Sequence, residues 1–102
     1  MNLLKKVFGK ENTNYHHLIK EGAIILDVRT ELEYSAGHIN GSINIPIDLL
    51  PGKLHLLKDK NKPIITCCAS GMRSASAKRI LLSHGYTSVH NAGSWLSLQN
   101  KA

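Results

Sequence analysis

The two cysteines of this chain are adjacent, and an arginine follows them at a spacing that suits two kinds of chemistry. In the segment IITCCASGMRSASAKRILLSHGY, residues 64–86, a Cys-x5-Arg pattern starts at Cys67 and a Cys-x4-Arg pattern starts at Cys68, both ending at Arg73. The longer spacing suggests phosphoryl transfer and the shorter one suggests sulfur transfer. The first question is therefore which cysteine, if either, is a nucleophile.

The loop after the cysteines has the composition of an anion cradle. Gly71 lies just before a predicted helix, whose first backbone N–H groups have no acceptor within that helix. Such a turn aims N–H donors and the positive end of the helix dipole at one point, which lowers the pKa of a thiol held there. Arg73 adds a fixed charge and a forked donor for an oxyanion substrate. These features favour Cys68 as the functional thiol and Cys67 as a buried core thiol.

Strand alternation favours the same assignment. Successive side chains of a strand point to opposite faces, so if Cys67 is the last strand residue it points into packing, and Cys68 is free to face the loop. A disulfide between the two is not expected, because adjacent Cα atoms are about 3.8 Å apart, below the usual ~4.4–6.8 Å. We expect reduced thiols, which suits the cytosol.

The elements that must position this loop alternate along the chain. Two continuous apolar runs predict strands buried on both faces, AIILDV (23–28) and PIITCC (63–68), and shorter strands are expected in SINIP (42–46) and TSVHN (87–91). Alternating strands and helices imply right-handed crossovers and an α/β fold, with a mainly parallel sheet of four or five strands and helices on both faces. Ligands of such sheets bind outside the carboxyl ends of the strands, where the cysteine pair lies.

Helix start and stop signals lie between the predicted strands. NYHHLIKEG is expected to end at Gly22, and SASAKRILLSHG at Gly85. In TELEYSAG, Thr30 and Glu33 form a predicted capping box. IDLLPGKLHLL (47–57) is expected to be helical in part, with a break or a helix start at Pro51, and SWLSLQN is expected to form a terminal helix.

Length and composition fit one small domain. The chain has 102 residues, of which 42% are hydrophobic and 20% are charged, enough for a single core. Residues 1–12 are predicted to be a flexible N-terminal arm, and residues 13–102 the domain. A formal charge of +6 favours an anionic small substrate, whereas the absence of any nucleic-acid reader motif argues against nucleic acid. No apolar run approaches the roughly 20 residues of a membrane span, so we expect a cytoplasmic monomer that does not bind membranes.

Two separated motifs resemble those of single-domain rhodaneses, which are sulfurtransferases. CASGMRS fits the active-loop pattern Cys-x-Ser-Gly-x-Arg-Ser, and DVRTELEYSAGHINGSINIP fits the upstream signature of that family. The resemblance spans about Asn14 to Trp95 and implies a three-layer rhodanese-like fold. The second motif is long, and phosphatases with a Cys-x5-Arg loop do not share it.

The resemblance implies a reaction and a set of residues. Cys68 would be the nucleophile of a six-residue loop, taking a sulfane sulfur from thiosulfate or a persulfide and passing it to a thiol or cyanide. Asp27 and Arg29 would support the site by tying loops together. No metal or organic cofactor is required, and the partners would be the small-molecule donor, the thiol acceptor and a sulfur-relay protein. The substrate-binding residues would be Ala69, Ser70, Gly71, Met72, Arg73 and Ser74.

Four further positions near these motifs have individual explanations. Glu33 is explained by helix capping, and His38 is assigned a structural role because an ionised thiolate needs no base. Cys67 stands where the family usually has an aromatic residue or His, and it could take a relay or redox role. Ser94 stands where a second glycine is common, so the loop near the site is expected to differ.

The variable positions of the loop bear on the sulfur donor, and two other functions remain open. Apart from Arg73 the loop is uncharged, which favours a persulfide over thiosulfate as donor. One alternative is a catalytically idle rhodanese module that serves as a protein-binding or regulatory domain. The other, ranked lower, is a small phosphatase that uses Cys67.

Overall fold

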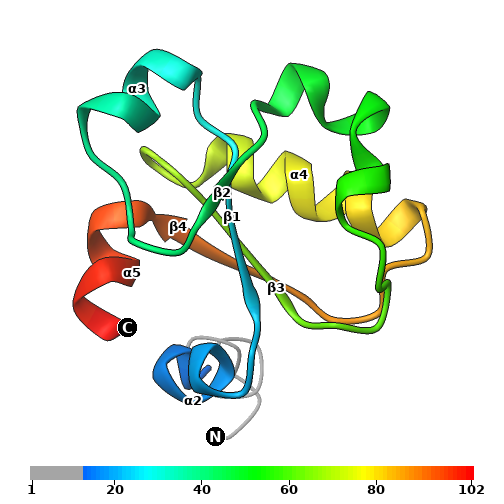
Figure 1. The fold of residues 1–102 in the computed structure, drawn as a ribbon, viewed down its shortest axis with the longest axis horizontal. Coiled ribbons are helices and arrows are strands. Elements are labelled where there is room, and N and C mark those ends of the chain that lie inside the picture. Colours follow the sequence, from blue (N-terminus) through cyan, green and yellow to red (C-terminus); the bar gives the residue numbers. More distant parts are fainter. Residues whose placement is uncertain (1–12) are drawn as a thin grey trace, which may run out of the picture.

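The computed structural model describes residues 13–102, which form a four-stranded parallel sheet with helices around it (Figure 1). The strands are β1 (Ile24–Asp27), β2 (Ile43–Asn44), β3 (Ile64–Cys68) and β4 (Val89–Ser94), in the spatial order β2-β1-β3-β4. All three strand pairs are parallel. The predicted α/β class and the parallel sheet are therefore confirmed. The predicted arm of residues 1–12 lies outside the described residues, so the domain boundary stays a prediction.

Helical segments cover both faces of the sheet (Figure 1). One face packs against α4 (Met72–Ser83) and the 3-10 helices η2 (Ile47–Gly52) and η3 (Leu54–Leu56), around a cluster that includes Leu26, Leu50 and Leu81. The other face packs against α2 (Tyr15–Lys20) and α5 (Trp95–Lys101), around a cluster that includes Tyr15, Ile65 and Leu98. The expected three layers follow from these two clusters. Among residues 13–102, no helix is long and apolar enough to cross a membrane.

The predicted capping box is present at the start of α3 (Glu31–Ala36). The Thr30 hydroxyl accepts from the Glu33 amide at 3.2 Å, and the Glu33 carboxylate accepts from the Thr30 amide at 2.9 Å. Two backbone donors that the helix itself leaves unpaired are thereby satisfied. The expected break near Pro51 takes the form of two short 3-10 helices, with Pro51 inside the first.

β3 ends at Cys68, as the predicted strand 63–68 does, so Cys67 is not the last strand residue. Both boundaries of β4 differ from expectation. β4 begins at Val89 and extends through Ser94, where only residues 87–91 were expected. Ser94 is consequently a strand residue and the N-cap of α5, its hydroxyl accepting from the Ser97 amide at 3.3 Å. Ser94 thus caps α5 through its hydroxyl, which a glycine at this position could not do because it has no side-chain acceptor.

Strand alternation still separates the two cysteines. Cys67 lies in the cluster beneath α2 and α5, and Cys68 lies in the cluster beneath α4. Both side chains are almost fully buried, with 0% and 1% exposure. The two thiols therefore face opposite layers of the molecule.

Candidate active site

The loop between β3 and α4 brings backbone N–H groups to the sulfur of Cys68. The amide of Gly71 donates to Sγ at 2.9 Å and the amide of Ser74 donates to it at 3.4 Å. Gly71 is the N-cap of α4 and has φ of 111°, a left-handed conformation that a residue with a Cβ adopts only at a cost. The turn thus holds a sulfur atom at the N-terminus of a 12-residue helix.

These contacts decide the acidity of Cys68. Burial alone would raise its pKa, but hydrogen bonds from the Ser74 hydroxyl and from the amides of Ser74, Gly71 and Ser70 outweigh burial and lower the pKa below its ordinary value. Hydrogen bonding to the charged form is one of the three ways in which a protein shifts a pKa. Cys68 is therefore prepared to exist as a thiolate, the reactive form of a cysteine.

Cys67 is in the opposite electrostatic situation. Burial raises its pKa to about 12, and the nearby negative charge of Asp27 adds to this effect. Asp27 is the partner of Cys67 in the register between β1 and β3. Two cysteines adjacent in sequence therefore have pKa values shifted in opposite directions.

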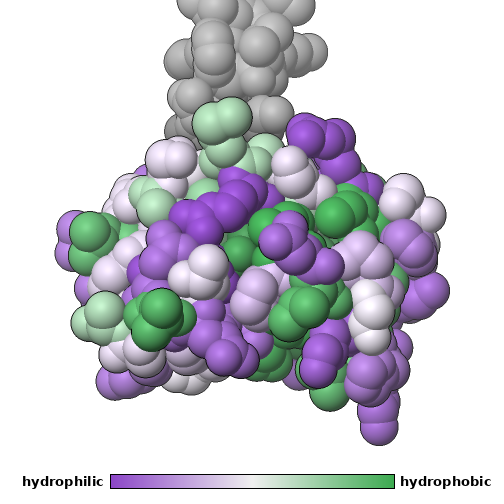
Figure 2. All heavy atoms as spheres, turned by 90° about the horizontal axis from the view of Figure 1, so that it is seen from above, coloured by the Kyte–Doolittle hydropathy of each residue, from purple (hydrophilic) through white to green (hydrophobic). Residues whose placement is uncertain are grey.

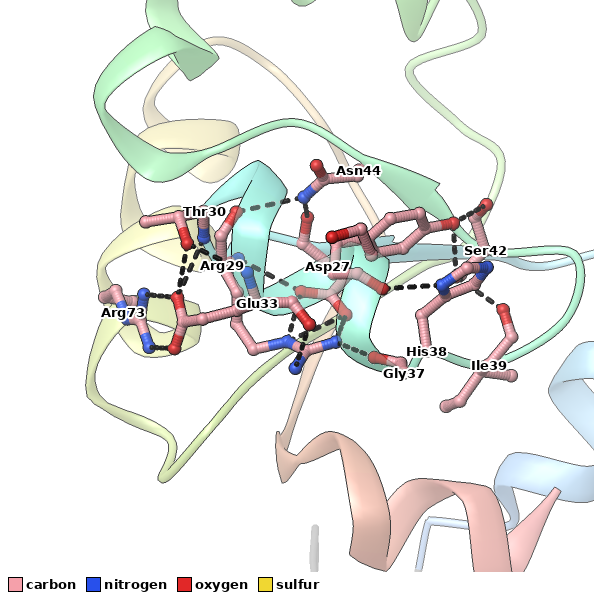
Figure 3. A network of polar contacts seen from close by, with 12 residues as sticks. Asp27, Arg29, Thr30, Glu33, Gly37, His38, Ile39, Ser42, Asn44 and Arg73 are labelled. Atoms are coloured by element: carbon pink, nitrogen blue, oxygen red, sulfur yellow. Dashed lines mark hydrogen bonds and ion pairs between the residues drawn. The ribbon is translucent and has the colours of Figure 1, made fainter.

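Arg73 is occupied by an ion pair (Figure 3). Its Nη1 lies 2.7 Å from Oε1 of Glu33, and its Nη2 lies 3.0 Å from Oε2, a bidentate arrangement. The Arg73 side chain also lowers the pKa of Glu33 to about 2, assisted by the Thr30 amide. Glu33 therefore does more than cap α3, because it also joins this helix to the start of α4. The sequence contains no local signal for this contact, since the two residues are 40 positions apart.

A second, buried ion pair stands behind the loop. Asp27 and Arg29 are 1% and 4% exposed, and Nη2 of Arg29 lies 2.7 Å from Oδ2 of Asp27. Arg29 also donates to the carbonyl oxygens of Glu33 at 3.3 Å and Gly37 at 2.8 Å (Figure 3). Its guanidinium lies 4.6 Å from the ring centre of Trp95. The pair thus joins β1 to α3, to the residue that ends α3 and to the start of α5. These contacts are of the loop-tying kind predicted for both residues.

Comparison with known proteins agrees with this geometry. The family model of the Rhodanese-like domain matches residues 11–101. The chain belongs to the rhodanese-like domain family.

Three curated relatives show the range of this family. The chain is 39% identical over 69 residues to Thiosulfate sulfurtransferase PspE of Escherichia coli K12, covering 67% of this chain and 66% of the relative. It is 34% identical to a tRNA uridine(34) hydroxylase of Hamiltonella defensa, covering 74% of this chain and 23% of the relative. It is 32% identical to Thiosulfate:glutathione sulfurtransferase of Saccharomyces cerevisiae, covering 84% and 65%. The chain thus spans just under two thirds of each sulfurtransferase and less than a quarter of the hydroxylase.

A solved structure shows the same fold. The structure described as rhodanese with anions from E. coli superposes with a TM-score of 0.69 at 35% identity, covering 74% of this chain and 91% of that one. The rhodanese fold expected from the two motifs is thereby confirmed.

The remaining predicted loop residues lie around the sulfur in different ways. Ala69 and Ser70 are exposed between the end of β3 and Gly71, and Met72 is 80% exposed as the first residue of α4. Ser74 is buried, and its carbonyl oxygen accepts from the Thr66 hydroxyl at 3.0 Å. The loop therefore has a buried floor and an exposed rim.

His38 packs against Tyr34 of α3 and is not part of the loop between β3 and α4. Its Nδ1 is 2.7 Å from the carbonyl oxygen of Tyr34, and its ring stacks on that of Tyr34 with centroids 3.8 Å apart (Figure 3). The Tyr34 hydroxyl in turn donates to the Ser42 carbonyl oxygen at 2.8 Å. These contacts fit the structural role expected for His38.

Asn91 contacts this site although the sequence pattern assigned it only to a strand. Its Oδ1 accepts from the Ser74 hydroxyl at 2.6 Å and from the Gly93 amide at 2.9 Å, and its Nδ2 lies 3.4 Å from the Gly71 carbonyl oxygen. An asparagine in a short strand carries no signal of such a role. Only the pairing of β3 with β4 brings it to the loop.

Proposed function

We propose that this protein is a sulfurtransferase that carries a sulfane sulfur on Cys68 as a persulfide. The observation that carries the proposal is that the backbone amides of Gly71 and Ser74 both donate hydrogen bonds to the sulfur of Cys68. Backbone donors already in place around a sulfur anion need no reorganisation during reaction, which is the general basis of electrostatic stabilisation in enzymes. The kinship with two proteins named as thiosulfate sulfurtransferases supports the same reaction class.

The transfer takes place in two balanced steps. The Cys68 thiolate attacks the outer sulfur of a persulfide, RS–SH, forming Cys68–S–SH and releasing RS⁻; with thiosulfate the leaving group is sulfite and the product is Cys68–S–S⁻. An acceptor thiolate then attacks the outer sulfur, the S–S bond breaks, and the electron pair returns to Cys68 as thiolate. Cyanide in place of the thiolate yields thiocyanate. The covalent intermediate divides one difficult transfer into two easier ones.

The charges at the rim favour an uncharged or weakly charged donor. The carboxylate of Glu33 engages both terminal nitrogens of Arg73, so this arginine presents little free positive charge to a dianion such as thiosulfate. Beside this ion pair the side chains of Leu32 and Met72 are 83% and 80% exposed. Viewed from above, from the side of α3 in Figure 1, the molecule presents hydrophobic groups interspersed with hydrophilic ones (Figure 2). We therefore propose a low-molecular-weight or protein-bound persulfide as the preferred donor and a thiol as the acceptor.

Turnover by the purified protein tests the proposal. Thiosulfate:cyanide transfer and transfer from glutathione persulfide to a thiol are measured in parallel, and the persulfide is expected to be the better donor. Cys68→Ser is expected to abolish both activities, because a serine hydroxyl is not ionised at neutral pH and cannot carry a persulfide.

Cys67→Ser is the matched control and is expected to keep most of the activity. Mass spectrometry after donor treatment should locate one added sulfur on Cys68. Added sulfur on Cys67, or an inactive Cys67→Ser, would reopen the phosphatase-like register. A folded wild-type protein that takes no sulfur from either donor would favour the idle, protein-binding module.

A further inference from the structure

Asn91 on β4 contacts the two residues, Gly71 and Ser74, whose amides donate hydrogen bonds to the Cys68 sulfur. Its Oδ1 accepts from the Ser74 hydroxyl at 2.6 Å, and its Nδ2 lies 3.4 Å from the carbonyl oxygen of Gly71. Its own backbone oxygen accepts from the Tyr15 hydroxyl at 3.4 Å, and its Oδ1 also accepts from the Gly93 amide. The Gly93 amide of β4 thus holds the carboxamide, and Tyr15 of α2 holds the backbone of Asn91.

The Ser74 hydroxyl has one proton and three possible acceptors. These are Oδ1 of Asn91 at 2.6 Å, the carbonyl oxygen of Gly71 at 3.1 Å and Sγ of Cys68 at 3.4 Å. A hydroxyl donates once and accepts through its lone pairs. At these distances the proton lies on the Asn91 side while Cys68 is a thiol, and the S–H of Cys68 donates to the oxygen of Ser74.

Ionisation of Cys68 reverses this arrangement. A thiolate has no proton to donate and attracts the hydroxyl proton, because hydrogen bonds to charged groups are roughly twice as strong as neutral ones. The Ser74 hydroxyl then turns from Asn91 to the sulfur. Asn91 therefore competes with the thiolate for one proton, and this competition limits how acidic Cys68 becomes.

We propose that Asn91 is a positioning residue for Cys68, acting by holding the hydroxyl proton of Ser74 until a sulfur anion forms. The inference rests on the sulfurtransferase function proposed above and adds a control over the balance of its two steps. A lower thiol pKa makes Cys68 a better leaving group when sulfur departs, and it makes the thiolate a weaker nucleophile when sulfur arrives. Asn91 and Ser74 together set the compromise between these steps.

Two substitutions at Asn91 act in opposite directions on this competition. Asn91→Ala removes the acceptor, so the Ser74 proton turns to sulfur, and the pKa of Cys68 should fall by about one pH unit, the size of one hydrogen bond to an anion. Asn91→Asp keeps an acceptor in the same place, binds the Ser74 proton more strongly and adds a negative charge. The pKa of Cys68 should then rise by about one pH unit.

The experiment measures the pKa of Cys68 from the pH dependence of its alkylation by iodoacetamide, in Ser74 and Ser74→Ala backgrounds. With Ser74→Ala the intermediary is absent, so the effect of Asn91→Ala should disappear and that of Asn91→Asp should fall to less than half. The other charged and titratable groups on elements packed around Cys68 are common to all these variants and cancel in the comparison. They include Asp27, Arg29, Glu33, Asp48, His55, Cys67, Arg73, Lys78, Arg79 and His90.

The opposite signs separate positioning from simple support of the loop. If Asn91 only keeps the loop in shape, both substitutions displace the amide donors and both raise the pKa of Cys68, with or without the Ser74 hydroxyl. That result would overturn the proposal, as would equal shifts in the two backgrounds. Should Asn91→Asp fail to fold, the sign of the Asn91→Ala shift decides alone. Alkylation uses no sulfur donor, so the result stands apart from the turnover test of the proposed function.

Discussion

Brief alkylation near neutral pH should modify Cys68 and spare Cys67, although the two residues are neighbours. Burial, followed by the charge of Asp27, raises the pKa of Cys67 from an ordinary 9.0 to about 12. Each pH unit of this rise lowers the thiolate fraction tenfold, while the more basic thiolate regains about threefold in intrinsic reactivity for a Brønsted coefficient of roughly 0.4–0.5. Cys67 should therefore react roughly 30- to 60-fold more slowly than an ordinary thiol, before any hindrance from packing.

The pKa of Cys68 moves in the other direction, so the difference between the two thiols exceeds that figure. Burial opposes its ionisation, but the hydrogen bonds from Ser74, Gly71 and Ser70 together prevail. As the pH rises, the alkylation rate of Cys68 should level off below the pH at which an ordinary thiol does so. The rate of Cys67 should still be rising there.

The assay is peptide mapping after timed exposure to iodoacetamide at several pH values. One tryptic peptide ending at Arg73 contains both thiols, so the label is located by fragmentation between them, with Cys67→Ser and Cys68→Ser as references. Circular dichroism at each pH verifies that the fold persists. Equal labelling of the two thiols in the folded protein, or faster labelling of Cys67, would refute the assignment of the amide donors to Cys68.

Three further predictions concern the rim and the turn of the loop. Glu33→Gln keeps a capping side chain but frees the charge of Arg73, so the use of thiosulfate relative to a persulfide should improve by roughly three- to fivefold, the effect of an exposed charge interaction of about 0.6–1 kcal/mol. Arg73→Ala should instead reduce the relative use of thiosulfate. Equal changes with both donors would mean that the ion pair only shapes the loop. Because the pKa of Glu33 in the folded protein is lowered to about 2, the stabilising effect of its carboxylate is present above about pH 4.5 and is lost as the pH falls through 2. The difference in Tm between wild type and Glu33→Gln should therefore close over that pH range. A difference in Tm that stays constant would contradict this prediction. Gly71→Ala places a Cβ at φ of 111°, so it should lower the free energy of unfolding in urea by about 1–2 kcal/mol and raise the pKa of Cys68. An unchanged urea midpoint would show that alanine adopts this turn without strain.

Local patterns account for most of the elements that the structure shows. The capping box of Thr30 and Glu33, the left-handed Gly71 before α4 and the continuous apolar runs of β1 and β3 each depend on residues within a few positions of one another. Boundaries were less predictable. β4 reaches Ser94 because it pairs with β3 up to Cys68, and that pairing joins residues 26 positions apart.

Local sequence alone indicates which thiol stands before the glycine turn, since Cys68, Gly71 and Ser74 lie within one turn-and-helix segment. The hydrogen bonds to its sulfur come from that same segment. Two long-range contacts of the site depend on the tertiary fold: the Glu33–Arg73 ion pair and the hydrogen bond from the Ser74 hydroxyl to Asn91. The physical reason is that a parallel sheet gathers at its carboxyl edge the ends of strands that are distant in sequence. Side-chain partners across that edge depend on strand order and register, which no local pattern records.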